Sequence, residues 1–266
     1  MNDRVAISIS DGVADVRLVR ADKMNALDPA MFRALSEAGE RLKTEAGVRA
    51  VVLSGEGRAF CAGLDMASFA AMDAREAGAM RDLRARTHGI VNLFQHVAWV
   101  WREVPVPVVA AVHGVAFGGG FQIMLGADIR YVAPDTKLSI MEIKWGLVPD
   151  MAGTQLMRSL ARDDIVRELT YTGRVFTGTD ALQYGFATRL SDDPRRDALE
   201  TAREIAAKSP DAIRAAKRLL NAAPFVEAAD RLIAESVEQQ ALIGSPNQLE
   251  AVQANIGRRA ARFADP

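Results

Sequence analysis

The sequence predicts an α/β protein with a body of strands and helices over residues 1–192 and a helical region over residues 193–266. The chain opens with alternating apolar and polar residues, carries a glycine cluster between a buried strand and a helix, and becomes almost purely helical after Pro194. With 266 residues, 49% of them hydrophobic, it is long enough for one well-buried core and an appendage.

The first elements are a hairpin, a helix and a buried strand. Residues 5–9 and 13–19 alternate around Asp11-Gly12, a residue pair suited to positive φ in a tight turn. Asp28 is the predicted N-cap of a helix with Pro29 at its first position, because apolar residues follow at helical spacing. The short apolar run 50–53 is typical of a buried strand.

The middle of the chain leads up to the glycine cluster. Helical periodicity over residues 68–102 predicts two helices, which end before Pro105 and Pro107. An apolar strand is predicted at 108–112, and the run Gly118-Gly119-Gly120 precedes a helix at 121–127. Strands are predicted at 129–132 and 137–139, and helices at 154–160, 164–170, 180–185, 197–207, 210–220 and 226–240.

The composition excludes several classes of protein. Lys and Arg number 33 against 34 Asp and Glu, so no basic field attracts nucleic acid or an anionic membrane. A single cysteine and three scattered histidines indicate neither a disulfide framework nor a metal site. Because no signal peptide and no run of eighteen apolar residues is present, we expect a cytoplasmic protein.

The glycine cluster is the first candidate site. A helix N-terminus presents unpaired N–H groups, and glycines before it allow a ligand to approach the backbone closely. The cluster therefore fits an anion or oxyanion site, although a tight turn alone would also explain it. The motifs of phosphate loops, dinucleotide folds and serine hydrolases do not occur.

Together with other motifs, this cluster resembles the crotonase superfamily of enoyl-CoA hydratases and isomerases. The resemblance runs nearly end to end. It is carried by Arg20-Ala21-Asp22-Lys23-Met24-Asn25-Ala26-Leu27, Phe60-Cys61-Ala62-Gly63-Leu64-Asp65, His113-Gly114, Ala127-Asp128-Ile129-Arg130-Tyr131, Gly146-Leu147-Val148-Pro149, Gly153-Thr154-Gln155 and Ser209-Pro210.

The resemblance implies a spiral of repeated ββα units with C-terminal helices that build a homotrimer or homohexamer. It implies an acyl-CoA thioester as substrate, with coenzyme A as part of that substrate and no separate cofactor. The N–H groups of Leu64 and Gly119 would hold the thioester oxygen while an enolate forms. The implied substrate-binding residues are Lys23, Met24, Ala26, Leu27, Ala62, Gly63, Asp65, Met66, Gln122 and Phe263.

The acids and bases beside the enolate decide the reaction. Family hydratases use two glutamates, and here Gln122 stands at the first position and Glu142 at the second. Gln cannot exchange protons near neutral pH, so the water-activating pair is broken. Asp150 resembles the aspartate of the dienoyl-CoA isomerase branch, although that branch has another aspartate where Gln122 stands. We therefore expect an isomerase in which Glu142 and Asp150 pass protons between distant carbons.

Several alternatives stay open at this stage. The chain could be a hydratase that uses Glu142 alone, or a non-catalytic member that binds CoA or RNA. Each candidate also has a purely structural alternative. Gln122 could face solvent on its helix, Glu142 could be an exposed strand end, and Asp150 could be a turn residue. Cys61 is more typical of a packed thiol than of a nucleophile, and His113 of a structural residue. An acyl tunnel or simple core packing would explain Met66, Phe69, Met72, Met80, Leu83, Leu93, Phe94 and Trp99.

Overall fold

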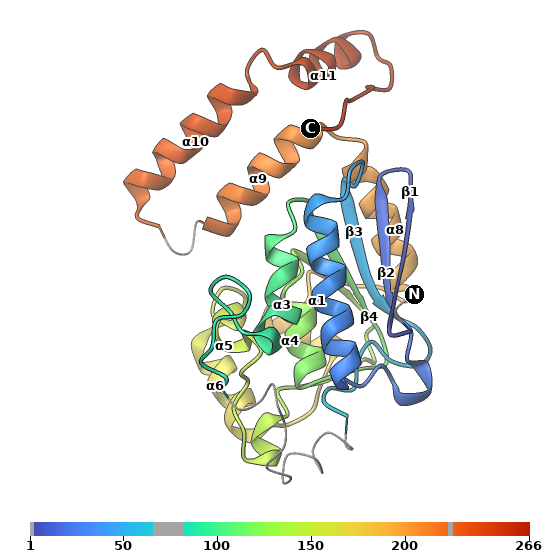
Figure 1. The fold of residues 1–266 in the computed structure, drawn as a ribbon, viewed down its shortest axis with the longest axis vertical. Helices are drawn as coiled ribbons and strands as arrows, with labels where there is room; N and C mark the ends of the chain where they lie inside the picture. Colours follow the sequence, from blue (N-terminus) through green and yellow to red (C-terminus); the bar gives the residue numbers. More distant parts are fainter. Residues whose placement is uncertain (1–2, 66–81, 223–225) are drawn as a thin grey trace.

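A computed structural model describes residues 3–65, 82–222 and 226–266, and Figure 1 shows its arrangement. The main sheet has six strands in the order β1-β2-β3-β4-β6-β9, in which β1 is antiparallel to β2 and the others are parallel. The bounds are β1 (Val5–Ser10), β2 (Val13–Leu18), β3 (Ala50–Gly55), β4 (Val108–Val112), β6 (Ile129–Val132) and β9 (Arg189–Leu190).

A second, three-stranded sheet has the order β5-β7-β8, with β5 (Val115–Phe117), β7 (Lys137–Ser139) and β8 (Phe176–Thr177). Only two residues separate β4 from β5. Gly114 makes this turn at a φ of 65°, and a Cβ there would lie 2.0 Å from the Arg58 carbonyl oxygen. The chain thus passes from a strand of one sheet to a strand of the other and then into a helix, which confirms the predicted ββα architecture.

Helices cover the main sheet on both faces. The core on one side is closed by helices that include α1 and α3, where Trp101 of α3 is fully buried. On the other side α8 packs its small residues Ala198, Ala202 and Ala206 against the sheet. The helices before the C-terminal region are α1 (Pro29–Thr44), α3 (Leu93–Glu103), α4 (Gly119–Leu125), α5 (Gly153–Met157), α6 (Asp163–Thr172), α7 (Gly178–Tyr184) and α8 (Pro194–Ala206).

The last three helices, α9 (Pro210–Ala222), α10 (Ala228–Leu242) and α11 (Pro246–Ile256), stand apart from the body in Figure 1. Lys217 of α9 joins them to the body, because its buried ammonium donates to the carbonyls of Trp101 and Val106 and to Asp128. The domain boundary near Asp192 stays a prediction. By packing, α8 lies with the sheet, whereas α9 to α11 project away from it.

Most of the predicted elements are present, with different ends. The hairpin is confirmed, and Asp28 caps α1 by accepting from the Met31 N–H at 2.7 Å. Of the two helices predicted over 68–102, the described residues contain α3, while 66–81 lie outside them. Glu142 begins a 3-10 helix, η3 (Glu142–Trp145), rather than ending a strand. The short strands β5, β8 and β9 and the helix α11 were not predicted.

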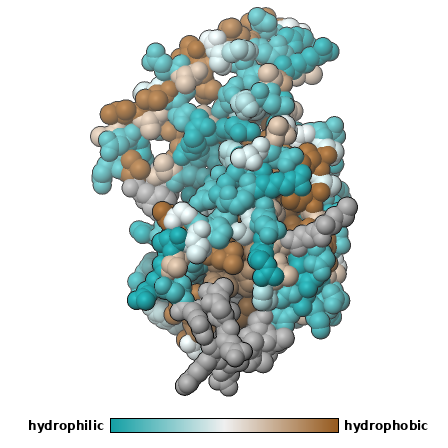
Figure 2. Space-filling model, in the orientation of Figure 1, coloured by the Kyte–Doolittle hydropathy of each residue, from teal (hydrophilic) through white to brown (hydrophobic). Residues whose placement is uncertain are grey.

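Figure 2 shows a surface of mixed hydrophilic and hydrophobic residues, with apolar groups on the projecting helices. Among the described residues, no helix has both the length and the apolar character needed to cross a membrane.

Candidate active site

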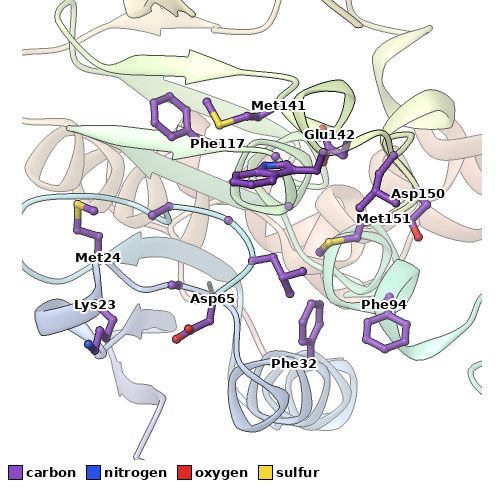
Figure 3. Close-up of a pocket in the computed structure, with 18 of the residues that line it drawn as sticks. Lys23, Met24, Phe32, Asp65, Phe94, Phe117, Met141, Glu142, Asp150 and Met151 are labelled. Atoms are coloured by element: carbon purple, nitrogen blue, oxygen red, sulfur yellow. The ribbon is translucent and has the colours of Figure 1, made fainter. Parts of the chain in front are cut away.

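A cavity of about 860 Å³ opens between the 62–65 loop, the start of α4 and the 3-10 helix η3 (Figure 3). It brings together ten of the residues predicted for the site, which come from five places in the sequence: Lys23, Met24, Ala26, Ala62, Gly63, Leu64, Asp65, Gly119, Glu142 and Asp150. Phe32, Leu83 and Phe94 add apolar wall, and Phe32 and Phe94 meet edge to face.

Two glycines allow the loop and the helix to approach each other. Gly63 has a φ of 87°, and a Cβ there would lie 2.7 Å from the Phe117 oxygen and 3.8 Å from the Gly119 nitrogen. The loop therefore runs directly beside the first turn of α4. Within the described part of the chain, the N–H groups of Leu64 and Gly119 have no hydrogen-bond acceptor, so both are available to a ligand.

The glycine cluster is held in place by close packing. A Cβ on Gly119 would lie 2.7 Å from Met151 Sδ and 2.8 Å from Leu27 Cδ1, and one on Gly120 would lie 2.3 Å from the Cys61 oxygen. The cluster is thus more than a tight turn, because side chains at these positions would collide with Met151, Leu27 and Cys61. Leu27 is fully buried and packs against Gly119, and it does not line the cavity.

Gln122 is fully buried and fixed by three hydrogen bonds, which is inconsistent with a solvent-facing residue. Its Oε1 accepts from the N–H groups of Met151 at 2.8 Å and Gly153 at 3.0 Å. Its Nε2 donates to Glu142 Oε1 at 2.6 Å. The two backbone donors determine which end of the amide faces Glu142.

Glu142 presents one free oxygen. Oε1 accepts from Gln122, whereas the buried Oε2 has no hydrogen-bond partner among the described residues. Burial raises the pKa of this carboxyl, and nearby Asp150 raises it further, while the bond from Gln122 opposes the change. A carboxyl group in such surroundings is suited to accept and return a proton.

Asp150 lies in the same cavity wall, and Figure 3 shows its side chain at the end near Phe94, away from Lys23 and Met24. Although the residue as a whole is exposed, partial burial of its carboxyl group raises its pKa. Two carboxyl groups with raised pKa values, Glu142 and Asp150, thus face one cavity at different positions along it.

The turn before α1 is tied to the loop that carries Leu64. Arg20 forms a half-buried ion pair with Asp65 and donates to the Ala26 carbonyl at 2.9 Å. Asn25, fully buried at a φ of 55°, donates to the carbonyls of Glu56 and Ala59. The structural roles of Arg20 and Asn25 were not predicted, and the only signal for them in the sequence is their place in the 20–27 motif.

Some predicted residues lie elsewhere. Met66 is outside the described residues, as are Phe69, Met72 and Met80. Phe263 does not line the cavity of this chain; its carbonyl accepts from Arg49 at 2.8 Å, near the last residues of the chain. Asp65 lines the cavity, but its carboxylate is engaged by Arg20.

Cys61 and His113 were expected to be structural residues, and each forms a hydrogen bond with a backbone carbonyl. Burial raises the pKa of the Cys61 thiol to about 12, so no thiolate forms near neutral pH, and its Sγ donates to the Asn25 carbonyl. His113 Nε2 forms a hydrogen bond with the Gly57 carbonyl at 2.9 Å.

A cavity with two free N–H groups and two carboxyl groups of raised pKa has the chemical groups needed to polarise a carbonyl and to move protons beside it. Residues 8–266 match the model of the enoyl-CoA hydratase/isomerase family. The chain therefore belongs to this family, within the crotonase superfamily.

Individual relatives have different activities. The mouse mitochondrial methylglutaconyl-CoA hydratase is 30% identical over 260 residues, which are 95% of this chain and 79% of that protein. The mouse mitochondrial Delta(3,5)-Delta(2,4)-dienoyl-CoA isomerase is also 30% identical, over 93% of this chain and 77% of that protein. The crystal structure of an enoyl-CoA hydratase from Bacillus anthracis matches with a TM-score of 0.89, 27% identity and 98% coverage of both chains.

Proposed function

We propose that this enzyme is an isomerase that shifts double bonds of enoyl- or dienoyl-CoA thioesters. Leu64 and Gly119 would donate their N–H groups to the thioester oxygen and stabilise the enolate. Glu142 would exchange a proton at the carbon nearer the thioester and Asp150 at a more distant carbon. A proton removed at one carbon and returned at another moves the double bond without adding water.

The observation that carries this proposal is the hydrogen bonding of Gln122. By the resemblance, Gln122 stands at the position of the first hydratase glutamate. Its amide N–H donates to Glu142, and an amide cannot take a proton from water as a carboxylate would. Beside Glu142, the carboxyl group in the cavity whose pKa is raised is Asp150, and this raised pKa favours proton exchange. A hydratase using Glu142 alone is the second candidate, favoured by the unpartnered Oε2 of that residue.

The test is product analysis with a panel of enoyl- and dienoyl-CoAs. Isomerisation leaves the mass of the substrate unchanged, whereas hydration adds one water. We expect Asp150→Asn to lower double-bond migration by about a hundred- to ten-thousand-fold, because it removes a proton carrier with little change in volume. CoA thioester binding should remain. Brisk hydration of crotonyl-CoA together with a silent Asp150→Asn would contradict the proposal and favour the hydratase.

A further inference from the structure

A second, smaller cavity of about 180 Å³ adjoins the first one at Asp150, which lines both. The short segment 149–152 separates them, because Met151 faces the first cavity while Pro149 and Ala152 face the second. In Figure 3, Lys23 and Met24 lie at one end of the first cavity, and Asp150 and Phe94 lie at the other. With the CoA part of a thioester at Lys23 and Met24, as the proposed function has it, the acyl chain would run toward the second cavity.

The second cavity differs from the first in chemistry. It has apolar walls that include Trp99 and Ile90, and its polar groups come from Arg86, Gln95, Asp150, Thr154 and Gln155. Arg86 is the only Lys or Arg among the described residues that line it. Because a water molecule fills about 30 Å³ in the liquid, the space suffices for a few non-hydrogen atoms.

The Arg86 guanidinium is held in place without a counter-ion. Nη1 donates to Gln95 Oε1 at 2.9 Å, Nε donates to the Arg84 carbonyl at 2.8 Å, and Nη2 donates to the Leu83 carbonyl. Gln95 is itself fixed in the capping box of α3 with Asn92. Arg86 forms no ion pair with an Asp or Glu in the described part of the chain, and two of its five N–H donors remain for a ligand.

From this arrangement we infer that the enzyme prefers thioesters whose acyl group ends in a second carboxylate, which Arg86 binds. The inference rests on the proposed function, because it places the thioester at Leu64 and Gly119. A guanidinium pairs well with a carboxylate, and one already oriented by hydrogen bonds loses little freedom on binding. An acyl chain ending in a methyl group would cover Arg86 without replacing its water, which is unfavourable. Between two acyl chains of equal length, the enzyme therefore binds the one that ends in a carboxylate more tightly.

Binding of unreactive, saturated thioesters tests the inference without requiring turnover. Calorimetric titration would compare succinyl-, glutaryl- and adipyl-CoA with butyryl-, pentanoyl- and hexanoyl-CoA, which have the same numbers of acyl carbons. At one or more lengths, the dicarboxylic thioester should bind at least about tenfold more tightly, and added salt should reduce the difference.

Two variants identify the residue responsible. Arg86→Gln should abolish the difference between the two series and leave the affinity for the monocarboxylic thioesters within about twofold. Arg84→Gln removes the same charge from the same loop. Both arginines are exposed, but Arg84 is paired with Asp82 and lies outside the cavity, so the preference should persist.

Equal affinity for the two series at every length, or an equal loss in both variants, would overturn the inference while leaving the proposed function intact. If none of the six thioesters binds, the proposed function fails and the inference fails with it.

Discussion

At the scale of single residues, Gln122 holds a buried position next to Glu142 that a carboxylic acid could also occupy. The residue type excludes proton exchange near neutral pH, and this much is readable from sequence. Its three hydrogen bonds add a second role, because they orient Glu142 and hold the 151–153 backbone. Gln122 is thus a positioning residue at a place where the family's hydratases carry an acid.

Gln122→Glu should raise hydration of a short trans-2-enoyl-CoA. The new carboxylate would keep one oxygen on the Met151 and Gly153 N–H groups and place the other where Nε2 now lies 2.6 Å from Glu142. Two carboxylates so close share a proton, and a positioned acid or base contributes about a hundred- to ten-thousand-fold. The measurement is the rate of water addition against pH. Gln122→Met, which restores no carboxylate, is the control and should not raise hydration; an equal rate in both variants would contradict this role.

At the scale of elements, the loop carrying Leu64 and the start of α4 act as a unit. Leu64→Pro should lower turnover by about a hundred- to a thousand-fold, because proline removes the N–H that is free to bind the thioester oxygen. Leu64→Ala retains this N–H and should stay within about tenfold of the native rate. Steady-state kinetics would compare the variants, and similar losses in both would mean that the side chain matters rather than the donor.

The contact between α1 and α3 contains a buried histidine. His96 is fully buried, forms a 2.8 Å hydrogen bond with Ser36 and stacks on His88 at 4.3 Å. Glu40, Glu103 and Lys43 also face it. Burial lowers the pKa of His96, with His88 and Lys43 acting in the same direction and the two carboxylates opposing them. The folded protein therefore binds a proton at this site less readily than the unfolded chain does.

From this difference we predict that the free energy of unfolding falls as pH drops below about 6.5, the ordinary pKa of histidine. The loss should continue until the pH reaches the lowered pKa of the folded state. Urea unfolding between pH 5 and 8 would measure it. His96→Gln should flatten this pH dependence, whereas His113→Gln, at a histidine outside this cluster, should leave it in place. A native slope unchanged in His96→Gln would show that other groups cause it.

At the scale of the whole molecule, α9 to α11 expose more apolar surface than a monomer usually leaves in water. In the described chain α10 buries none of its residues, and Leu232, Ile233 and Val237 are each more than 60% exposed. We propose that these helices join copies of the chain into a trimer or hexamer. Light scattering should find such an assembly at micromolar concentration.

The variant Ile233→Glu/Val237→Glu should weaken this assembly, because it would bury two unpaired charges in the interface. Arg33→Glu on the exposed surface of α1 is the control and should leave the assembly intact. A native protein that is monomeric at these concentrations would refute the proposal.

The sequence by itself determined the family and the chemical types available at the site. The glycine cluster, Leu64, Glu142 and Asp150 stand in local motifs, and such motifs carry residue type, turn conformation and helix starts without any long-range information. The hairpin and the Asp28 cap were predicted for the same reason, since both depend on neighbours a few residues away. The two-residue strands β8 and β9 were missed because they are too short for periodicity and form only by pairing with distant strands.

Only the tertiary structure decided how these residues meet. The hydrogen bonds from Arg86 to Gln95 and from Gln122 to Glu142 and the ion pair between Arg20 and Asp65 join residues 9 to 45 positions apart, and the cavity around Arg86 adds residues from the more distant segment 149–155. The raised pKa values of Glu142 and Asp150 arise mainly from burial, and burial depends on which elements pack over each side chain. Periodicity records which side of a helix or strand is apolar, but it does not record which distant segment covers that side. Which residue from a distant segment contacts each site residue is therefore decided only when the chain folds, and the electrostatics of the site are decided with it.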